Sequence, residues 1–135
     1  MEKNTGRELN ETELAGIAGG RGTAPGLADW AMRAVGWDFV WGGSEPGGVD
    51  SAGLIFSYAG GARHPEDMFR IAPEKGTISS IPDTPGIGVY KYGHVGVYVG
   101  GGMCVCALNE EEGVVYRGLA AGGWTHWFRI AGVEY

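Results

Sequence analysis

The sequence predicts an α+β domain in which N-terminal helices pack on a C-terminal antiparallel sheet. Helical patterns come first, over residues 25–35 and 51–59, and short β-branched runs follow from residue 87 onward. Many of the 27 glycines fall in pairs and triplets between apolar runs, which indicates turns rather than a flexible tract. With 135 residues and 44% hydrophobic content, the chain is expected to form one compact domain with its own core.

Two helices are expected before the strands. The first should run from Pro25 to Val35, where Gly36 ends it. Its apolar contacts are expected from four side chains, Leu27, Trp30, Met32 and Val35. The second should run over residues 51–59, with Asp50 as its N-cap and glycines 60 and 61 as its stop.

The rest of the chain is predicted to be a long loop followed by strands. Residues 62–86 hold four of the six prolines, so we expect a loop there, with a short helix near residues 67–72. Five strands are expected, at 87–90, 94–99, 103–108, 113–117 and 127–130. A three-residue glycine turn at 100–102 would pair positions that sum to about 202 and place Cys106 diagonal to His94 on one face. The valines at 95, 97 and 99 should face the core, and His94 the opposite side.

Charge and composition argue against several classes of function. The net charge is −6 and no basic patch is visible, so nucleic-acid binding is not expected. No apolar stretch approaches the length of a membrane span, and the first twenty residues do not resemble a secretory signal peptide. Cys104 and Cys106 form no disulfide framework, and with three scattered histidines they offer too few ligands for zinc. We therefore expect no metal and no cofactor.

Residues 1–20 differ from the rest of the chain, since they contain no aromatic residue and end in two glycines. They resemble the double-glycine leaders that precede bacteriocins, whose characteristic positions are here Leu9, Glu13, Leu14, Ile17, Gly19 and Gly20. The resemblance implies cleavage after Gly20 by a peptidase-containing ABC transporter. The leader-bearing form would then be cytoplasmic, and residues 21–135 would be exported or associated with the cell wall. The alternative is an ordinary disordered tail.

Ser51 and His94 are the candidate catalytic residues. Ser51 opens a helix, where free N–H groups and the helix dipole stabilise negative charge. His94 begins a strand, and Gly96 beside it leaves room on the same face. A nucleophile at a helix start facing an imidazole on a strand is the arrangement of papain-like hydrolases. The alternatives are that Ser51 is a second capping residue and that His94 is a surface histidine.

Two motifs carry a resemblance to a known family. They are Asp50-Ser51-Ala52-Gly53-Leu54, preceded by the glycine-rich turn at 42–48, and His94-Val95-Gly96-Val97-Tyr98. Together they resemble the NlpC-type cell-wall endopeptidases, which are papain-like cysteine peptidases. The resemblance covers nearly all of residues 25–135 and implies an NlpC-type fold and hydrolysis of peptidoglycan stem peptides. It maps the family's cysteine to Ser51, its general base to His94, and its third polar residue to Cys106.

Three positions depart from the family pattern. Ser51 lacks the thiol, Phe39 stands where many members have tyrosine, and Cys106 cannot accept a strong hydrogen bond from His94. The serine is compatible with an engineered replacement of a native cysteine, whereas Phe39 and Cys106 favour a natural degenerate relative. As written, the enzyme is expected to be inactive.

Three functions are therefore carried forward: a cell-wall endopeptidase, a pseudoenzyme that binds stem peptides without cutting them, and a secreted bacteriocin-like effector. Other candidate residues are weaker. His64 is expected in an exposed loop, and His126 in packing or in the substrate cleft. Trp124 and Trp127 are expected mainly in the core, with a peptide-binding groove as the alternative. The sequence leaves the oligomeric state open.

Overall fold

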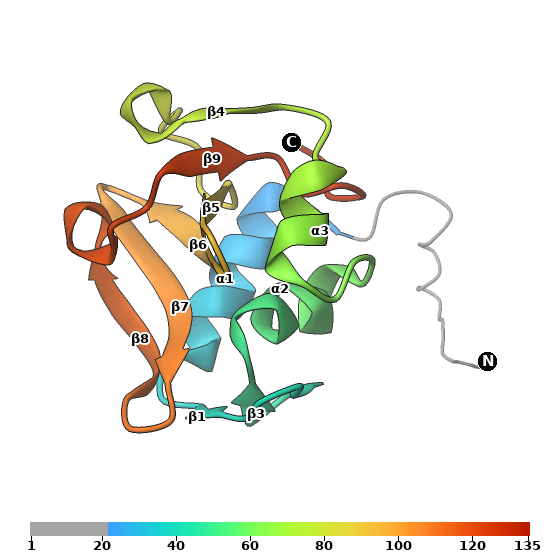
Figure 1. Cartoon of the computed structure of the whole chain (residues 1–135), viewed down its shortest axis with the longest axis vertical. Helices are drawn as coiled ribbons and strands as arrows, with labels where there is room; N and C mark the ends of the chain where they lie inside the picture. Colours follow the sequence, from blue (N-terminus) through green and yellow to red (C-terminus); the bar gives the residue numbers. More distant parts are fainter. Residues whose placement is uncertain (1–21) are drawn as a thin grey trace.

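The computed structural model describes residues 22–135, so the predicted leader lies outside the described residues. Three helices, α1 (Ala24–Ala34), α2 (Ser51–Ala59) and α3 (Pro65–Arg70), precede the main sheet in the chain (Figure 1). That six-stranded sheet has the order β4-β9-β5-β6-β7-β8, and each neighbouring pair is antiparallel. Its strands are β4 (Lys75–Thr77), β5 (Gly88–Lys91), β6 (His94–Gly100), β7 (Met103–Asn109), β8 (Gly113–Gly118) and β9 (His126–Phe128). The predicted α+β class is confirmed.

Helix α1 packs on the sheet through small residues. Thr23 caps it by accepting a hydrogen bond from the Gly26 N–H at 3.1 Å. The buried face follows helical spacing and consists of Ala24, Leu27, Ala28, Ala31 and Ala34. Met32 and Val35 are 45% and 41% exposed, so the prediction that they supply apolar contacts is wrong. Alanines occupy the contact because they let the helix approach the strands closely.

Helix α2 has the predicted bounds and lies inside the molecule. The Asp50 carboxylate caps it, accepting from the Gly53 N–H at 2.6 Å and from the Gly42 N–H at 3.0 Å. The same side chain therefore ties the glycine-rich turn to the start of the helix. Gly53 allows this close approach, because a Cβ atom there would lie 1.8 Å from the Gly43 carbonyl oxygen.

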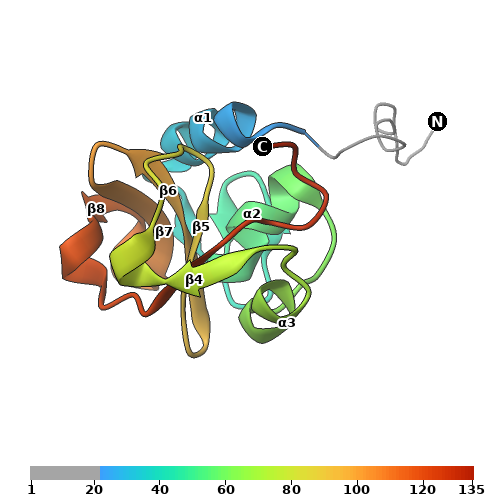
Figure 2. The same cartoon turned by 90° about the horizontal axis from the view of Figure 1, so that it is seen from above.

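The two faces of the main sheet carry separate apolar clusters. Val95 and Val97 are buried in the cluster that contains the helices, as predicted, and Val99 packs against it. Figure 2 shows α1 and α2 on the same side of the central strands. The opposite face holds a second cluster, made of Ile87, Val89, Tyr98, Cys104, Cys106, Trp124 and Trp127. The expectation that both tryptophans are packed in the core is thus confirmed.

The β6–β7 hairpin differs from its prediction. Gly100 pairs with Met103, so the turn has two residues, Gly101 and Gly102, both with positive φ. An irregularity between Tyr98 and Gly100 compensates, and Tyr98 still pairs with Cys104. The predicted register is therefore correct although the predicted three-residue turn is not.

Some elements were not expected from the sequence. A three-stranded sheet within the glycine-rich region has the order β1-β3-β2, from β1 (Asp38–Phe39), β2 (Ser44–Glu45) and β3 (Gly48–Val49). The predicted loop at 62–86 contains α3, which begins at Pro65 rather than 67, together with β4 and the 3₁₀ turn η1 (Ile78–Ser80). Strand β9 begins one residue early and ends at Phe128, because it pairs with β4 and β5, which lie far from it in sequence.

The first and last described segments lie side by side. Thr23 forms a parallel bridge with Glu134, the Ala24 N–H donates to the Glu134 carbonyl at 2.8 Å, and the Glu134 N–H donates to the Gly22 carbonyl at 2.9 Å. Within residues 22–135, no helix combines the length and the apolar character needed to cross a bilayer.

Candidate active site

A cleft of about 450 Å³ opens where the start of α2 faces the start of β6. Its walls come from the glycine-rich turn, the α2–α3 connection and the β7–β8 turn. The residues that line it are Phe39, Trp41, Gly42, Asp50, Ser51, Ala52, Arg63, His64, Pro65, Gly93, His94, Leu108, Asn109 and Glu110. Ser51 and His94, which are 43 positions apart in sequence, therefore border the same space.

Ser51 is the first residue of α2 and is only 6% exposed. The cap is made by Asp50, so the alternative that Ser51 serves as a second capping residue has no support from the cap geometry. The N-terminal N–H groups of a helix stabilise an oxyanion or a thiolate placed there. A serine hydroxyl gains less from this position and depends on a base to remove its proton.

His94 is the first residue of β6 and is held by an aromatic partner. Its ring stacks on Trp124, with ring centroids 5.4 Å apart and an interplanar angle of 13°. Burial, together with the smaller effect of the positive charge of Lys91, lowers the pKa of His94 to about 4. The imidazole is therefore neutral at pH 7. It is also too weak a base to take a proton readily from a serine hydroxyl.

The Nε2 atom of His94 is enclosed and has no hydrogen-bond partner among the described residues. In papain-like sites the imidazole is oriented by a third polar group. The sequence assigns that position to Cys106, which the strand register places opposite Gly96, one pleat along from His94. Burial raises the pKa of Cys106 to about 11, so it is a neutral thiol and a weak acceptor. It lies on the far side of His94 from Ser51 and does not line the cleft.

Two further charged residues, Arg63 and Glu110, border the cleft, and sequence reasoning did not select them as site residues. Arg63 lies 3.5 Å from the Asp50 carboxylate, and its Nη2 donates to the Gly42 carbonyl at 3.1 Å. It thereby supports the turn that forms one wall. Glu110, on the β7–β8 turn, supplies the other carboxylate. Only the three-dimensional closure of the chain brings these residues to Ser51.

Of the remaining residues considered from the sequence, Phe39 and His64 line the cleft and His126 does not. Phe39 lies in the cleft and packs edge-to-face on Trp41, with ring centroids 4.9 Å apart. His64 is exposed, as expected, and lies on the cleft rim just before α3. His126 lies outside the cleft and packs on Phe69 at 5.2 Å. Within residues 22–135, no group of three or more His, Cys, Asp or Glu side chains is arranged to hold a metal ion.

Searches of protein-family models and of curated proteins find no match to this sequence. Solved structures do match. NlpC1 from Trichomonas vaginalis is similar with a TM-score of 0.67 and 20% identity, over 79% of this chain and 43% of that chain. The NlpC/p60 domain of the peptidoglycan hydrolase SagA gives 0.64 and 19%, over 80% of this chain and 99% of that chain. The peptidoglycan hydrolase RipB from Mycobacterium tuberculosis gives 0.61 and 23%, over 83% and 67%.

The similarity establishes the fold. The chain has the architecture of an NlpC/p60 papain-like domain, as its two motifs predicted. It spans less than half of the Trichomonas protein and almost the whole of the SagA domain. Sequence identities of 19–23% support a shared fold, but they do not show what chemistry position 51 performs in this chain.

Proposed function

We propose that residues 21–135 form a cell-wall hydrolase domain that acts on peptide bonds in peptidoglycan stem peptides. Position 51 is the nucleophile position and His94 is the general base. The observation that carries the proposal is that Ser51, at the first turn of α2, and His94, at the start of β6, border one cleft. The similar structures SagA and RipB are peptidoglycan hydrolases, which supports this class of substrate.

The chemistry needs a thiol at position 51. A thiolate there would attack the scissile carbonyl carbon, and the backbone N–H groups at the start of α2 would bind the oxyanion. His94 would then give its proton to the leaving amine, and water would hydrolyse the acyl-enzyme. With serine at position 51 and a histidine whose pKa is about 4, the first proton transfer is strongly unfavourable. The protein with Ser51 is therefore proposed to be inactive or nearly so.

The test is a Ser51→Cys variant assayed on purified muropeptides by mass spectrometry of the products. We expect cleavage to appear or to rise at least tenfold above the Ser51 protein. The double variant S51C/H94A should lose the gain, whereas S51C/H126A should keep it because His126 lies outside the cleft. A folded S51C protein that cuts no stem peptide would contradict the proposal.

A specific observation favours a second function, that of a pseudoenzyme that binds stem peptides without cutting them. His94 Nε2 lacks an acceptor, and Cys106 does not supply one. The cleft nevertheless has a volume of about 450 Å³. Trp41, at its rim, is 75% exposed and can contact a bound peptide. A sedimentation assay on purified peptidoglycan separates the two functions. Retention of the protein without turnover in both Ser51 and S51C forms, unchanged by His94→Ala, would favour the binding module.

The leader is proposed from the sequence of residues 1–20 alone. Cleavage after Gly20 by a peptidase-containing ABC transporter would export the domain as a secreted, bacteriocin-like effector or cell-wall enzyme. Such a cut would leave intact the bonds of Gly22, Thr23 and Ala24 to Glu134. Incubation with a double-glycine leader peptidase should release a product that starts at Arg21. A Gly20→Val variant should block its release.

A further inference from the structure

The Asp, Glu, Lys and Arg side chains that line the cleft beside Ser51 are Asp50, Arg63 and Glu110. The first two are bound to each other and to the glycine-rich turn. Arg63 lies 3.5 Å from the Asp50 carboxylate, and each of them also forms a hydrogen bond with the backbone of Gly42. Glu110 is exposed, and its carboxylate has no ion-pair or hydrogen-bond partner within residues 22–135. The cleft therefore presents one accessible negative charge that the described part of the chain leaves unbalanced.

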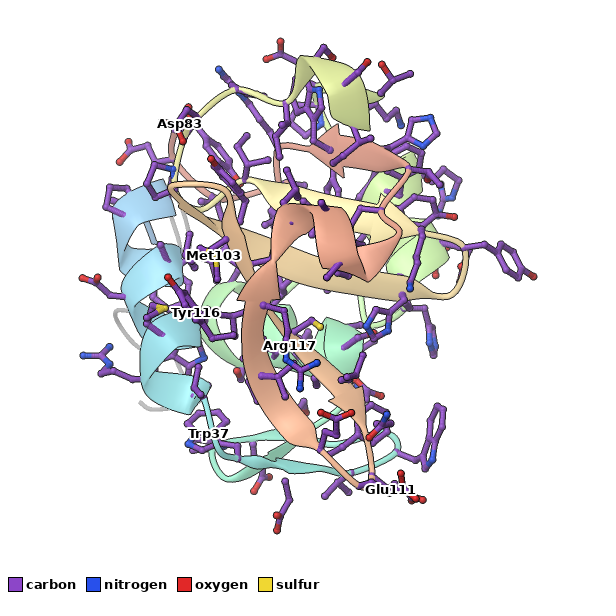
Figure 3. All side chains as sticks on the ribbon, turned by 90° about the vertical axis from the view of Figure 1, so that its left-hand side faces the viewer. Trp37, Asp83, Met103, Glu111, Tyr116 and Arg117 are labelled. Atoms are coloured by element: carbon purple, nitrogen blue, oxygen red, sulfur yellow. The ribbon has the colours of Figure 1, made fainter. Side chains whose placement is uncertain are left out.

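The turn that carries this carboxylate has a defined conformation. The Asn109 Oδ1 atom accepts a hydrogen bond from the Glu112 N–H at 2.8 Å, which closes the β7–β8 turn. The Val114 N–H then donates to the Trp37 carbonyl at 2.9 Å, so the start of β8 is attached to the segment that leads into β1. In Figure 3, Trp37 and Glu111 both lie toward the lower end of the molecule, where this segment and the turn meet. The carboxylate is thus carried on a turn that is anchored to the wall of the cleft.

That wall also presents an exposed aromatic side chain. Phe39 and Trp41 line the same cleft as Glu110, and they pack edge-to-face with ring centroids 4.9 Å apart. Despite this contact, Trp41 is 75% exposed. An apolar surface and a free carboxylate in one cleft suit a ligand group with methylenes along its length and a positive charge at its tip, since such a group packs its methylenes on apolar surface and keeps its charged end in a polar setting.

We propose that Glu110 is a specificity-determining residue, which binds the side-chain ammonium of the diamino acid in a stem peptide, while Trp41 packs on the methylenes of that side chain. This inference rests on the proposed function, because a stem peptide is what brings a diamino acid into the cleft. The side-chain amine is charged when it is free, and it is an uncharged amide when it is acylated in a cross-link. The cleft therefore selects uncross-linked stem peptides over cross-linked ones.

The same charge balance discriminates between diamino acids. The side chain of lysine or ornithine ends in an ammonium alone, whereas that of diaminopimelate carries a carboxylate beside its ammonium. This second carboxylate would meet Glu110, and the guanidinium of Arg63 is already bound to Asp50 and Gly42. Peptides of the lysine type are therefore expected to bind more tightly than peptides with unamidated diaminopimelate.

The primary test measures binding to the full-length Ser51 protein, in which turnover does not interfere. The probes are the tripeptide L-Ala-γ-D-Glu-L-Lys and the same peptide acetylated on the lysine Nε, titrated calorimetrically at pH 7.5. We expect the free amine to bind about fivefold more tightly in about 50 mM NaCl, which is the upper range of an exposed ion pair. Most of this difference should disappear in about 500 mM NaCl. Equal affinities, or tighter binding of the acetylated peptide, would overturn the proposal.

Variants then assign the preference to one carboxylate. Glu110→Gln should reduce the affinity ratio of the two peptides to near one. Glu111→Gln is the matched control and should keep the ratio, because Glu111 is an exposed carboxylate of the same turn that does not line the cleft. Trp41→Ala should weaken both peptides to the same extent, since both carry the same methylenes. Equal ratios in the two glutamate variants would count against Glu110.

Reversal of the charge gives a gain of function that a misfolded variant could not show. Glu110→Lys should prefer the peptide succinylated on Nε, which ends in a carboxylate, over the peptide with the free amine. Glu111→Lys should retain the original preference for the amine. A Glu110→Lys protein that still prefers the amine would overturn the proposal.

The S51C protein separates this inference from the proposed function. Cleavage of the amine and the acetylated peptide with equal kcat/KM would overturn the inference and leave the hydrolase standing. A binding preference that depends on Glu110, without cleavage by S51C, would overturn the hydrolase and keep Glu110 as the specificity residue of a binding cleft. Failure of both peptides to bind would overturn both.

Discussion

The ring of His94 lies almost parallel to that of Trp124, with centroids 5.4 Å apart, and the ammonium of Lys91 lies over the same indole. One tryptophan therefore positions both the imidazole that faces Ser51 across the cleft and a cation that disfavours its protonation. Trp124 was expected mainly as core packing, and it is buried, but its ring also covers one face of the candidate base.

Replacing this aromatic contact should make His94 more basic. Burial is the main cause of the low pKa of His94, so Trp124→Leu, which opens the site to water, should raise that pKa from about 4 toward the ordinary value of 6.5. NMR titration of the ring protons measures it. Trp127→Leu is the matched control, because Trp127 is equally buried but bonds Ser80 instead. A His94 pKa that stays near 4 in the Trp124 variant would show that burial is not the cause.

The stability of the domain should fall as the pH drops from about 6.5 to about 4. The pKa of His94 is lower in the folded state than in the unfolded state, so the unfolded chain binds the extra proton within this window. The lost stability is up to about 3 kcal/mol for this one group. Urea unfolding at pH 7, 5.5 and 4 measures it, with His94→Gln for comparison. A variant with the same pH dependence as the parent would assign the effect to the carboxylates.

A thiol at position 51 should be more reactive than the two native thiols. In Ser51→Cys, the N–H groups and the dipole at the N-terminus of α2 should lower the thiol pKa below about 8.5. Cys104 and Cys106 are buried with pKa values of about 12 and about 11, so they should not react. The rate of iodoacetamide labelling against pH measures the new thiol. An inflection at or above about 8.5 would contradict the stabilisation of the thiolate by the helix N-terminus.

Gly53 should tolerate no side chain. A Cβ atom there would overlap the Gly43 carbonyl oxygen at 1.8 Å, which forces the glycine-rich turn away from α2. Gly53→Ala should therefore destabilise the domain by about 3 kcal/mol. The control is Gly118→Ala, since Gly118 has an ordinary φ of −61° and no atom within 4 Å of the added carbon. Its cost should stay within about 0.5 kcal/mol in the same thermal unfolding measurement.

Local sequence signals predicted the elements that local chemistry specifies. Asp50 and Gly60 marked the ends of α2, and the alternation from His94 to Val99 gave both the strand and its buried face. The prediction that Met32 and Val35 make core contacts was wrong, because apolar character alone does not show which side of a helix packs on the sheet.

What the sequence did not predict depends on contacts between distant segments. Strand β4 exists because Lys75–Thr77 pairs with residues 126–128, and nothing within those three residues indicates a strand. The same holds at the candidate site. Ser51 and His94 were found through their motifs, whereas Arg63 and Glu110 reach the cleft only through the closure of the α2–α3 connection and the β7–β8 turn.

The bridge between Thr23 and Glu134 brings the two ends of the domain within backbone contact. A short peptide linker could therefore join them covalently, and new termini could be opened at the Gly101–Gly102 turn. Such a circular permutant should fold with the cleft unaltered. Because the break at Gly101–Gly102 lies after both residues, Ser51 and His94 would move together to the C-terminal part of the new chain and keep their order.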